Sequence, residues 1–332
     1  MRSDNEHHAS EEQIRIDPSP SAMSVMISIL THDRWPILRQ NLDGLVDIDD
    51  SALRIQIVDN ASSAPVEPQV KEAYPGVSVI RSEINRGACG RNLGMAAGDS
   101  DLIVTLDDDV TDFGADDLGR VRDRFAADDR LGALCFRVIH HKTGRVCNWC
   151  HHRKVELDSL NSFRTYEISE GAVAFRREAL LAAGLYPESF FISHEGLDLA
   201  YRLMNAGFTV EYDGTISVVH HHDAAGRPNW RRYYYDTRNM IWVAVRNMPW
   251  DYAARYLMLG MLSTGLYATR DGFLMAWLKA IRDGTKDIRV RRSERVVWNA
   301  GTRELCREID RARPGLWYMA KKRLFRRTMD LA

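Results

Sequence analysis

The chain has 332 residues, of which 45% are apolar and 27% are charged, and its formal net charge is −1. This composition is typical of a globular protein, and the near-neutral charge argues against nucleic acid as a partner. The length accommodates one large α/β domain with an extension, or two small domains.

The ends of the chain and its cysteines bear on location. Residues 1–22 are polar and have no apolar run, which predicts a disordered leader rather than a secretory signal. The five cysteines are odd in number and scattered, a pattern that favours reduced thiols in a cytoplasmic protein over a disulfide framework. No apolar run reaches the roughly 18 residues that a membrane-spanning helix needs.

Two basic segments lie near the C-terminus, KDIRVRRSER at 286–295 and KKRLFRR at 321–327. Such segments either approach anionic lipid or form a solvated face. The apolar stretches 256–269 and 273–281 are expected to be core helices or helices on a membrane surface. The sequence therefore leaves open a peripheral contact of the C-terminal region with the inner face of a membrane.

From residue 24 onward, short β-rich runs alternate with helical stretches. This alternation predicts an α/β fold, with parallel βαβ units in a doubly wound sheet covered by helices on both faces. Strands are predicted at 24–30, 54–58, 77–80, 102–106, 131–139, 172–175 and 215–219, and helices after Pro36, at 91–97, at 197–205 and from 230 onward.

Polar residues follow each of the first four predicted strands. Ligands of parallel sheets bind outside the carboxyl ends of the strands, where these residues meet. Four converging exits, one of them with three successive carboxylates, predict a binding site at this edge. The exits are Thr31-His32-Asp33-Arg34, Asp59-Asn60-Ala61-Ser62, Asn85-Arg86-Gly87 and Asp107-Asp108-Asp109.

The carboxylates of Asp107, Asp108 and Asp109 repel one another unless a cation or hydrogen-bond donors compensate. Carboxylate oxygens suit Mg²⁺ or Mn²⁺, which share their ligand shell with substrate phosphates. A metal ion here would neutralise a departing diphosphate as a Lewis acid. The cluster therefore predicts a site for Mg²⁺ or Mn²⁺ and a diphosphate.

The order and spacing of these motifs resemble those of the family 2 glycosyltransferases, the inverting group with the GT-A fold. The resemblance covers about residues 24–250. The matching segments are Thr31–Arg34, Val58–Ser62, the series Asn85, Gly87, Arg91, Asn92 and Gly94, Leu106–Val110, Glu170-Gly171, Arg176–Ala179, and Glu195–Leu199 with Arg202.

The resemblance implies a GT-A-like catalytic domain over 23–250, with a nucleotide-binding half (23–110) and an acceptor half (111–250), then a helical basic extension over 251–332. It implies transfer, with inversion, from a nucleotide-diphosphate sugar to a hydroxyl of a glycan, a lipid-linked acceptor or a small molecule. The residues expected to bind the donor are Thr31, Asp33, Arg34, Asp59, Asn60, Asn85, Gly87, Arg91, Asn92, Asp107 and Asp108; those expected to bind the metal are Asp107, Asp109, His220 and His222.

Glu195 and Asp198 are spaced to lie on one face of a predicted helix. Inverting transfer needs a base for the proton of the acceptor hydroxyl. The family's usual pattern there is Glu-Asp-x-Asp, whereas the second position here is Gly196. We therefore expect Glu195 to be the base and Asp198 to hold the site together. A salt bridge between Asp198 and Arg202 is the alternative.

Two other functions remain open. A nucleotidyltransferase that makes activated sugars usually has a glycine-rich basic loop after its first strand, and Thr31–Arg34 is not such a loop. A non-catalytic sugar-binding protein that keeps the fold remains open because of Gly196. The group Cys147, Cys150, His151 and His152 fits a zinc site or the c-type haem attachment pattern, but ordinary thiols in an acceptor-side loop are the preferred interpretation.

Overall fold

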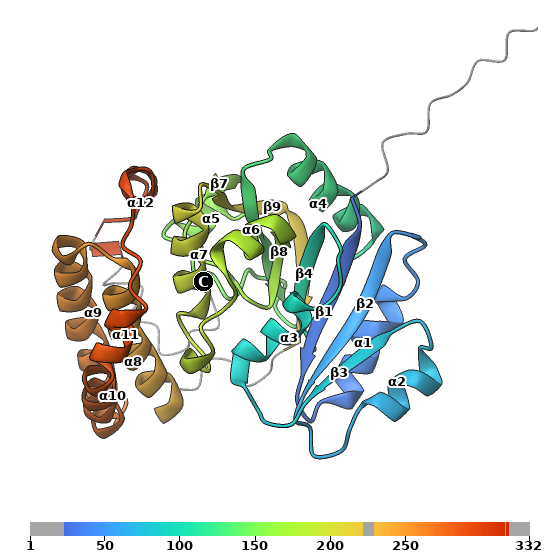
Figure 1. Cartoon of the computed structure of the whole chain (residues 1–332), viewed down its shortest axis with the longest axis horizontal. Coiled ribbons are helices and arrows are strands. Elements are labelled where there is room, and N and C mark those ends of the chain that lie inside the picture. The colour runs from blue at the N-terminus through green and yellow to red at the C-terminus, as the bar shows by residue number, and fades with distance from the viewer. Residues whose placement is uncertain (1–22, 222–228, 316, 319–332) are drawn as a thin grey trace, which may run out of the picture.

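The computed structural model of the chain describes residues 23–221, 229–315, 317 and 318. The predictions for the leader at 1–22, for His222 and for the basic segment at 321–327 lie outside these residues. The rest forms a nine-stranded mixed sheet with helices on both faces and a further helical layer on one side (Figure 1).

Four parallel strands in the order β3-β2-β1-β4 form the N-terminal half of the sheet. The central strands β1 and β4 consist of nearly continuous buried apolar residues, as expected for a parallel sheet covered on both faces. All four confirm strands predicted from the sequence. Their bounds are β1 (Val25–Thr31), β2 (Leu53–Asn60), β3 (Ser78–Ser82) and β4 (Leu102–Asp107).

The second half of the sheet is mixed in direction. Strand β8 runs antiparallel to both β4 and β6, whereas β6 and β9 are parallel. Because β8 is reversed, its first residue, Ala172, pairs with Leu106 near the end of β4. The residues before β8 thus lie at the carboxyl edge of the first four strands. The bounds are β5 (Val110–Thr111), β6 (Leu131–His140), β7 (Ser162–Arg164), β8 (Ala172–Arg176) and β9 (Thr209–His220).

Helices cover both faces of the sheet (Figure 1). Leu38, Leu42 and Leu45 share one face of α1 and pack with α2 and α4 in one apolar core. The opposite core contains residues of α3, α6 and α7. The bounds are α1 (Trp35–Leu45), α2 (Glu67–Ala73), α3 (Arg91–Ala96), α4 (Ala115–Ala127), α5 (Val155–Asp158), α6 (Arg177–Ala183) and α7 (Glu195–Asn205).

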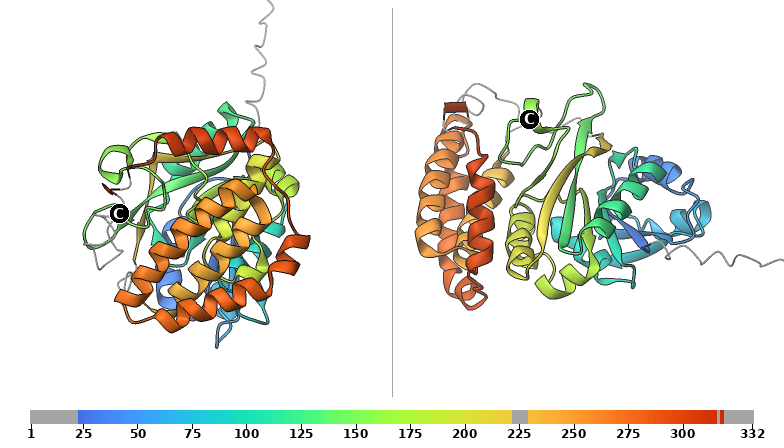
Figure 2. Two further views of the ribbon diagram at one scale, coloured as in Figure 1. Left: turned by 90° about the vertical axis from the view of Figure 1, so that its left-hand side faces the viewer. Right: turned by 90° about the horizontal axis from the view of Figure 1, so that it is seen from above.

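The C-terminal helices form a layer beside α7 (Figures 1 and 2). Helix α8 packs on α7 and also on α9, α10 and α11, so the expected boundary at residue 250 falls inside this layer. Gly284 lets α10 approach α8, because a Cβ there would meet Ile241 at 2.7 Å. The bounds are α8 (Trp230–Asn247), α9 (Trp250–Arg270), α10 (Leu274–Lys286), α11 (Ile288–Ser293) and α12 (Ala300–Arg311).

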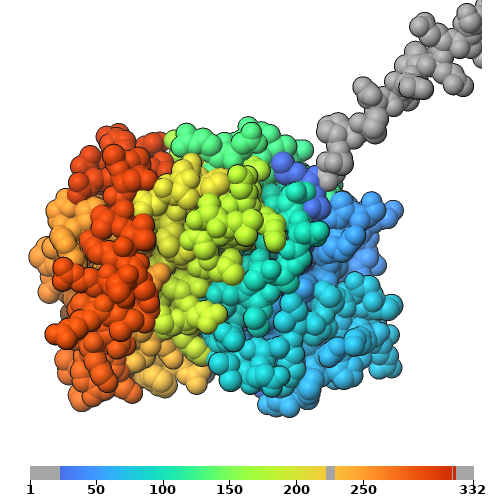
Figure 3. Space-filling model, in the orientation of Figure 1, coloured from blue at the N-terminus to red at the C-terminus, as the bar shows by residue number. Residues whose placement is uncertain are grey.

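The helical layer and the sheet domain form one continuous body in the space-filling view (Figure 3). Within the residues that the structure covers, none of the helices combines the length and the apolar character needed to cross a membrane.

Candidate active site

The ends of β1 and β4 bring predicted residues into contact. Thr31 Oγ1 donates to Asp108 Oδ2 at 2.8 Å. Arg34 donates to Asp108 at 3.2 Å and to Asp109 at 2.7 Å. The predicted convergence of strand exits is therefore confirmed for these segments. The contacts also bury Asp108, which braces the turn after β1 rather than lining the cavity described below.

His220 lies at the end of β9, opposite Val110 of β5. Its Nε2 is 3.3 Å from Asp109 Oδ1. Burial alone would lower the pKa of His220, but hydrogen bonds to Asp109 and Cys147 raise it to about 10. Strand β9 thus brings an imidazole to the carboxylates that follow β4.

The exits of β2 and β3 are joined through Asn60. Its Nδ2 donates to Asn85 Oδ1 and to the Gly87 carbonyl, both at 3.1 Å, and its Oδ1 accepts the Arg86 N–H at 2.9 Å. Gly87 has a φ of +61°, and a Cβ there would collide with Phe191. Glycine is therefore required at this turn.

Asp33 and Asp59 both fix the loop after β2. Asp33 Oδ1 accepts the Ser63 N–H at 2.6 Å. Asp59 is fully buried, and its carboxylate accepts the N–H groups of Ser62 and Val66 and pairs with Arg81. Burial would raise the pKa of Asp59, but these donors hold it below the usual value. A nucleotide base would have to displace one of these donors to reach the carboxylate.

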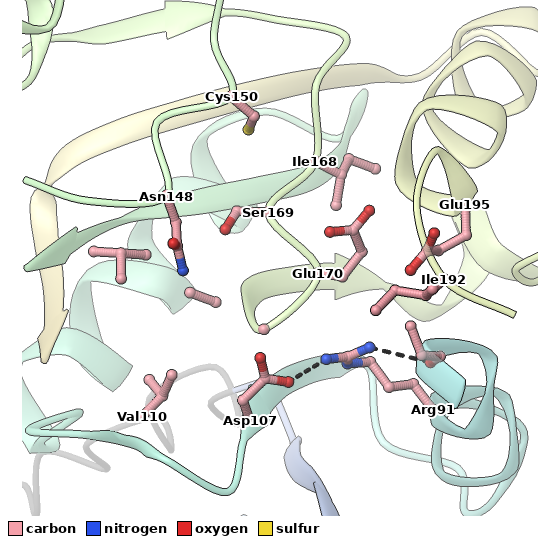
Figure 4. A pocket seen from close by; sticks show the side chains of 14 residues that line it. Arg91, Asp107, Val110, Asn148, Cys150, Ile168, Ser169, Glu170, Ile192 and Glu195 are labelled. Carbon is pink, nitrogen blue, oxygen red and sulfur yellow. Dashed lines mark hydrogen bonds and ion pairs between the residues drawn. The ribbon is translucent and has the colours of Figure 1, made fainter. Parts of the chain in front are cut away.

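A cavity of about 240 Å³ opens where β4 ends and β8 begins (Figure 4). Buried Arg91 lies beside it, paired with Asp107 and bonded to the Ala88 carbonyl at 3.1 Å. The lining residues are Ala88, Arg91, Asp107, Val110, Val138, Asn148, Cys150, Ile168, Ser169, Glu170, Gly171, Ala172, Ile192 and Glu195.

Two glutamates approach this cavity from different segments (Figure 4). Glu170 precedes β8, and Glu195 is the first residue of α7. Glu170 Oε1 accepts the Gly196 N–H at 3.0 Å, whereas Glu195 Oε2 is buried without a hydrogen-bond partner among the described residues. Burial, and then the neighbouring Glu170, raise the pKa of Glu195 to about 8. Burial also raises the pKa of Glu170.

A strained segment precedes Glu195. Phe191, Ser193 and His194 all have positive φ angles, between 64° and 76°. The side chain of Asn239 on α8 holds this segment by donating to the carbonyls of Phe190, Ile192 and Ser193 at 2.7–3.0 Å. Strain of this kind persists where surrounding contacts enforce it, as at functional sites.

Two predicted site residues, Asp198 and Asn92, bond to other groups within the fold. Asp198 is fully buried, and its oxygens accept from Arg202, Arg246 and Asn247 at 2.7–2.8 Å. The salt bridge to Arg202 is thus present, and Asp198 does not line the cavity. Asn92 likewise uses its amide on the backbone of Tyr186, donating at 2.8 Å and accepting at 3.0 Å. Asp198 therefore holds α7 in place through its ion pairs, while the contact expected between Asn92 and the donor stays a prediction.

Asp107, Asp109 and His220 have side chains that can bind a metal ion, but the three do not lie close together. In residues 23–221, 229–315, 317 and 318, no three His, Cys, Asp or Glu side chains are close enough together to hold an ion. Asp109 and His220 are in contact, while Asp107 turns toward Arg91. Two carboxylates and an imidazole still suit Mn²⁺, provided that Asp107 and Asp109 give up their ion pairs with arginine to bind the ion.

The alternative zinc site is not formed either in that part of the chain. His151 is buried, and its Nδ1 lies 3.1 Å from Thr165 Oγ1. Burial lowers the pKa of His151 to about 3. Cys150 lines the cavity as a thiol whose pKa is raised by burial. Cys150 therefore belongs to the wall of the candidate site, whereas His151 is buried outside that wall.

Comparison with protein families decides the assignment. Residues 26–182 match the family described as "Glycosyl transferase family 2". Just under half of the chain thus matches a family 2 glycosyltransferase domain. The matched segment includes the strand exits, the aspartate cluster and Glu170, and it ends before Glu195.

Curated relatives agree with this domain. Over 190 residues the chain is 25% identical to the O-antigen chain rhamnosyltransferase WbaN of Salmonella anatum, which covers 54% of this chain and 60% of the relative. Over 261 residues it is 24% identical to the pre-mycofactocin glycosyltransferase of Mycobacterium tuberculosis, covering 73% of this chain and 50% of the relative. The chain thus spans about half to three fifths of the length of these relatives.

A solved structure shares the fold of the family 2 domain. The structure of GalNAc-T7 with UDP, GalNAc and Mn²⁺ superimposes with a TM-score of 0.59 at 14% sequence identity, covering 81% of this chain and 58% of the other. The likeness confirms the GT-A fold class predicted from the sequence.

Sequence reasoning gave no role to three residues that shape the site of the family 2 domain. Glu170 was recognised only as part of a matching Glu-Gly pair, and its place depends on the reversed direction of β8. Asn148, in the cavity wall, lies in an irregular segment. Asn239 holds the strained segment from inside α8. Only Glu170 carried a usable signal, a carboxylate directly before a buried strand.

Proposed function

We propose that this chain transfers a sugar from a nucleotide-diphosphate sugar to an acceptor hydroxyl, with inversion at the anomeric carbon. The observation that carries the proposal is the cavity itself. It combines a cation, Arg91, with the carboxylates of Asp107, Glu170 and Glu195 at the carboxyl edge of the sheet. A diphosphate leaving group and an acceptor proton require groups of these opposite kinds.

On the donor side, we assign the nucleotide to the joined loops after β1, β2 and β3. Asp33, Asn60 and Asn85 order these loops. Arg34 and Arg91, both paired with aspartates of the β4 end, supply guanidinium groups suited to phosphate oxygens. The UDP held by the structurally similar GalNAc-T7 supports this assignment.

Mg²⁺ or Mn²⁺ is proposed as cofactor. Asp107, Asp109 and His220 would hold the ion, which when bound neutralises negative charge on the departing diphosphate. Arg91 and Arg34, which pair with these aspartates here, would then be available to the phosphates. The Mn²⁺ in the structure of GalNAc-T7 supports the choice of a divalent ion.

The competing functions have less support. After β1 the chain offers Thr31–Arg34, without the glycine-rich loop of a nucleotidyltransferase. A purely binding protein gains nothing from two mutually repelling glutamates, one buried and one half-buried, at the same cavity. A glycan, a lipid-linked sugar and a small molecule all remain candidate acceptors, because the described cavity carries no feature specific to one of them.

The donor is best identified by a thermal-shift screen of nucleotide sugars with Mn²⁺, because a bound ligand raises the unfolding temperature. The hits are then assayed for transfer and for slow donor hydrolysis. Asp109→Asn is expected to lose at least about 100-fold in turnover, whereas Asp123→Asn, an exposed carboxylate on α4, keeps it. Full activity of Asp109→Asn would overturn the proposal. Nucleotide binding without turnover by the unaltered protein would favour the binding-protein function.

We also propose that the enzyme works in the cytoplasm, against an anionic membrane surface. The supporting feature is a set of exposed apolar side chains on α9 and α10, two helices of the C-terminal layer (Figure 2). We call this set the patch. Leu262 and Met275 are 68% and 76% exposed. The patch consists of Met258, Leu259, Leu262, Leu266, Leu274, Met275 and Leu278.

The charge beside the patch favours lipid over a second copy of the chain. Within residues 250–295, seven exposed Lys and Arg side chains accompany two exposed carboxylates, Asp251 and Glu294. Basic residues flanking an apolar helix face are typical of helices that lie on anionic membranes. In a symmetric dimer through the same face, the positive charges would repel one another.

Flotation with vesicles of phosphatidylglycerol and phosphatidylcholine tests this location. The full chain is expected to float with anionic vesicles and to be released by salt or by Leu262→Glu with Met275→Glu. The control Leu181→Glu changes an exposed leucine on α6 and is expected to float as the unaltered chain does. No flotation, or a dimer in light scattering that the double variant splits, would contradict membrane docking.

A further inference from the structure

We propose that Glu170, rather than Glu195, is the carboxylate that removes the acceptor proton, and that Glu195 is its protonated neighbour. The inference rests on the proposed glycosyl transfer and assigns its base. It follows from the way in which Glu170 and Glu195 share one end of the cavity (Figure 4), with the Gly196 N–H bonded to Glu170.

Position 196 has no room for a side chain, because Glu170 fills the space that one would occupy. A Cβ at position 196 would overlap with Glu170 Oε1 and lie 3.0 Å from the Ile168 carbonyl oxygen. The Gly196 N–H instead donates to Glu170 Oε1 at 3.0 Å. The start of α7 therefore provides the space and the N–H donor that hold a carboxylate from another segment of the chain.

The backbone of Glu170 is held on the edge of the sheet. Its carbonyl accepts the Thr105 hydroxyl at 2.8 Å, and the next carbonyl, that of Gly171, accepts the Asp107 N–H at 3.2 Å. A Cβ at Gly171 would overlap with the Asp107 carboxylate. Glu170 is thus held close to Asp107, in a turn that hydrogen bonds anchor to β4 directly before β8 begins.

The two glutamates cannot both be ionised at low cost, because Glu195 is buried, Glu170 is half-buried, and their charges repel each other. A hydrogen-bond donor stabilises the ionised form, and Glu170 Oε1 accepts one from another segment of the chain, the Gly196 N–H. Glu195 Oε2 has no partner in the described residues. The proton shared by the pair therefore resides on Glu195, and Glu170 keeps the charge that a base needs.

The chemical step balances with these groups. The carboxylate of Glu170 takes the proton of the acceptor hydroxyl as the acceptor oxygen forms a bond to the anomeric carbon. The bond between that carbon and the β-phosphate oxygen breaks, and the nucleoside diphosphate leaves with the electron pair. Attack from the face opposite the leaving group gives inversion.

The experiment compares Glu170→Gln, Glu195→Gln and Glu170→Ala, with turnover and donor affinity measured separately. Glu170→Gln is expected to lower turnover by about 10²–10⁴-fold, with the Kd for the donor nearly unchanged. Glu195→Gln is expected to retain turnover within about tenfold, because Gln resembles the protonated acid in shape and hydrogen bonding. Formate is expected to restore part of the turnover of Glu170→Ala, since the vacated space accepts a small carboxylate.

A double variant keeps the test decisive if single changes disturb folding. Glu170→Ala combined with Gly196→Asp returns a carboxylate to the space that Glu170 occupies, and its turnover is expected to exceed that of Glu170→Ala. Equal loss in Glu170→Gln and Glu195→Gln, or full turnover in Glu170→Ala without formate, would overturn the assignment while leaving glycosyl transfer intact. Failure of the unaltered protein to bind any nucleotide sugar would instead overturn the proposed function itself.

Discussion

Arg246 on α8 lies with its Nε 2.7 Å from Asp198 Oδ2 on α7, and the Asp198 side chain is fully buried. This ion pair joins the helix that begins at Glu195 to the C-terminal helical layer. Burial alone would raise the pKa of Asp198, but Arg202 and Arg246 hold it below its usual value.

Asp198→Asn is therefore predicted to act on stability first. Removing one partner of a buried pair leaves uncompensated charge, so we expect a loss of about 3 kcal/mol in the free energy of unfolding, measured by urea denaturation. Asp251→Asn, in an exposed pair with Arg303, should cost less than about 1 kcal/mol. Unchanged stability with abolished turnover would show a direct catalytic role for Asp198.

Gly196→Ala is predicted to damage the site more than the fold. The new methyl group would overlap with Glu170 Oε1 and displace it, so turnover should fall at least about tenfold, as expected for a misplaced catalytic group. Gly119→Ala on α4 is the control, because a Cβ there meets nothing within 4 Å. Steady-state kinetics distinguish the two variants. Turnover of Gly196→Ala equal to that of the parent would contradict the position and role assigned to Glu170.

The pH dependence of stability reports on Glu195. Its pKa is raised to about 8 by burial and by Glu170, so the ionised form destabilises the fold. This cost is absent below the unfolded pKa near 4.5, grows as pH rises, and is complete above the folded pKa. Glu195→Gln should therefore nearly match the parent in stability at pH 5 and exceed it at pH 9, by about 5 kcal/mol. A pH-independent difference in thermal melts would refute the raised pKa.

Chelation tests the metal. EDTA is predicted to abolish transfer and donor hydrolysis, and Mn²⁺ or Mg²⁺ to restore them. Isothermal titration of the apo protein with Mn²⁺ should show binding that Asp109→Asn weakens at least about tenfold and Asp123→Asn does not. Full turnover in EDTA, with no heat of Mn²⁺ binding, would contradict a site at Asp107, Asp109 and His220.

The sequence predicted the N-terminal half of the site well. Continuous apolar runs identified β1 and β4, and parallel βαβ geometry then required Thr31 and the aspartates after β4 to meet, as they do. The remainder depended on strand direction and on tertiary partners. The reversal of β8, which places Glu170 in the cavity, and the ion pair of Arg246 with Asp198 leave no periodic signal in the chain.

The most direct test of glycosyl transfer at this cavity is the stereochemistry of donor hydrolysis. A nucleotide sugar that binds in the thermal-shift screen is incubated with the enzyme and Mn²⁺, and the released sugar is followed by proton NMR before mutarotation. Inverting transfer with Glu170 as the base predicts that the first product has the inverted anomeric configuration and that Glu170→Gln abolishes its formation. Release with retained configuration, or equal hydrolysis by Glu170→Gln, would contradict it.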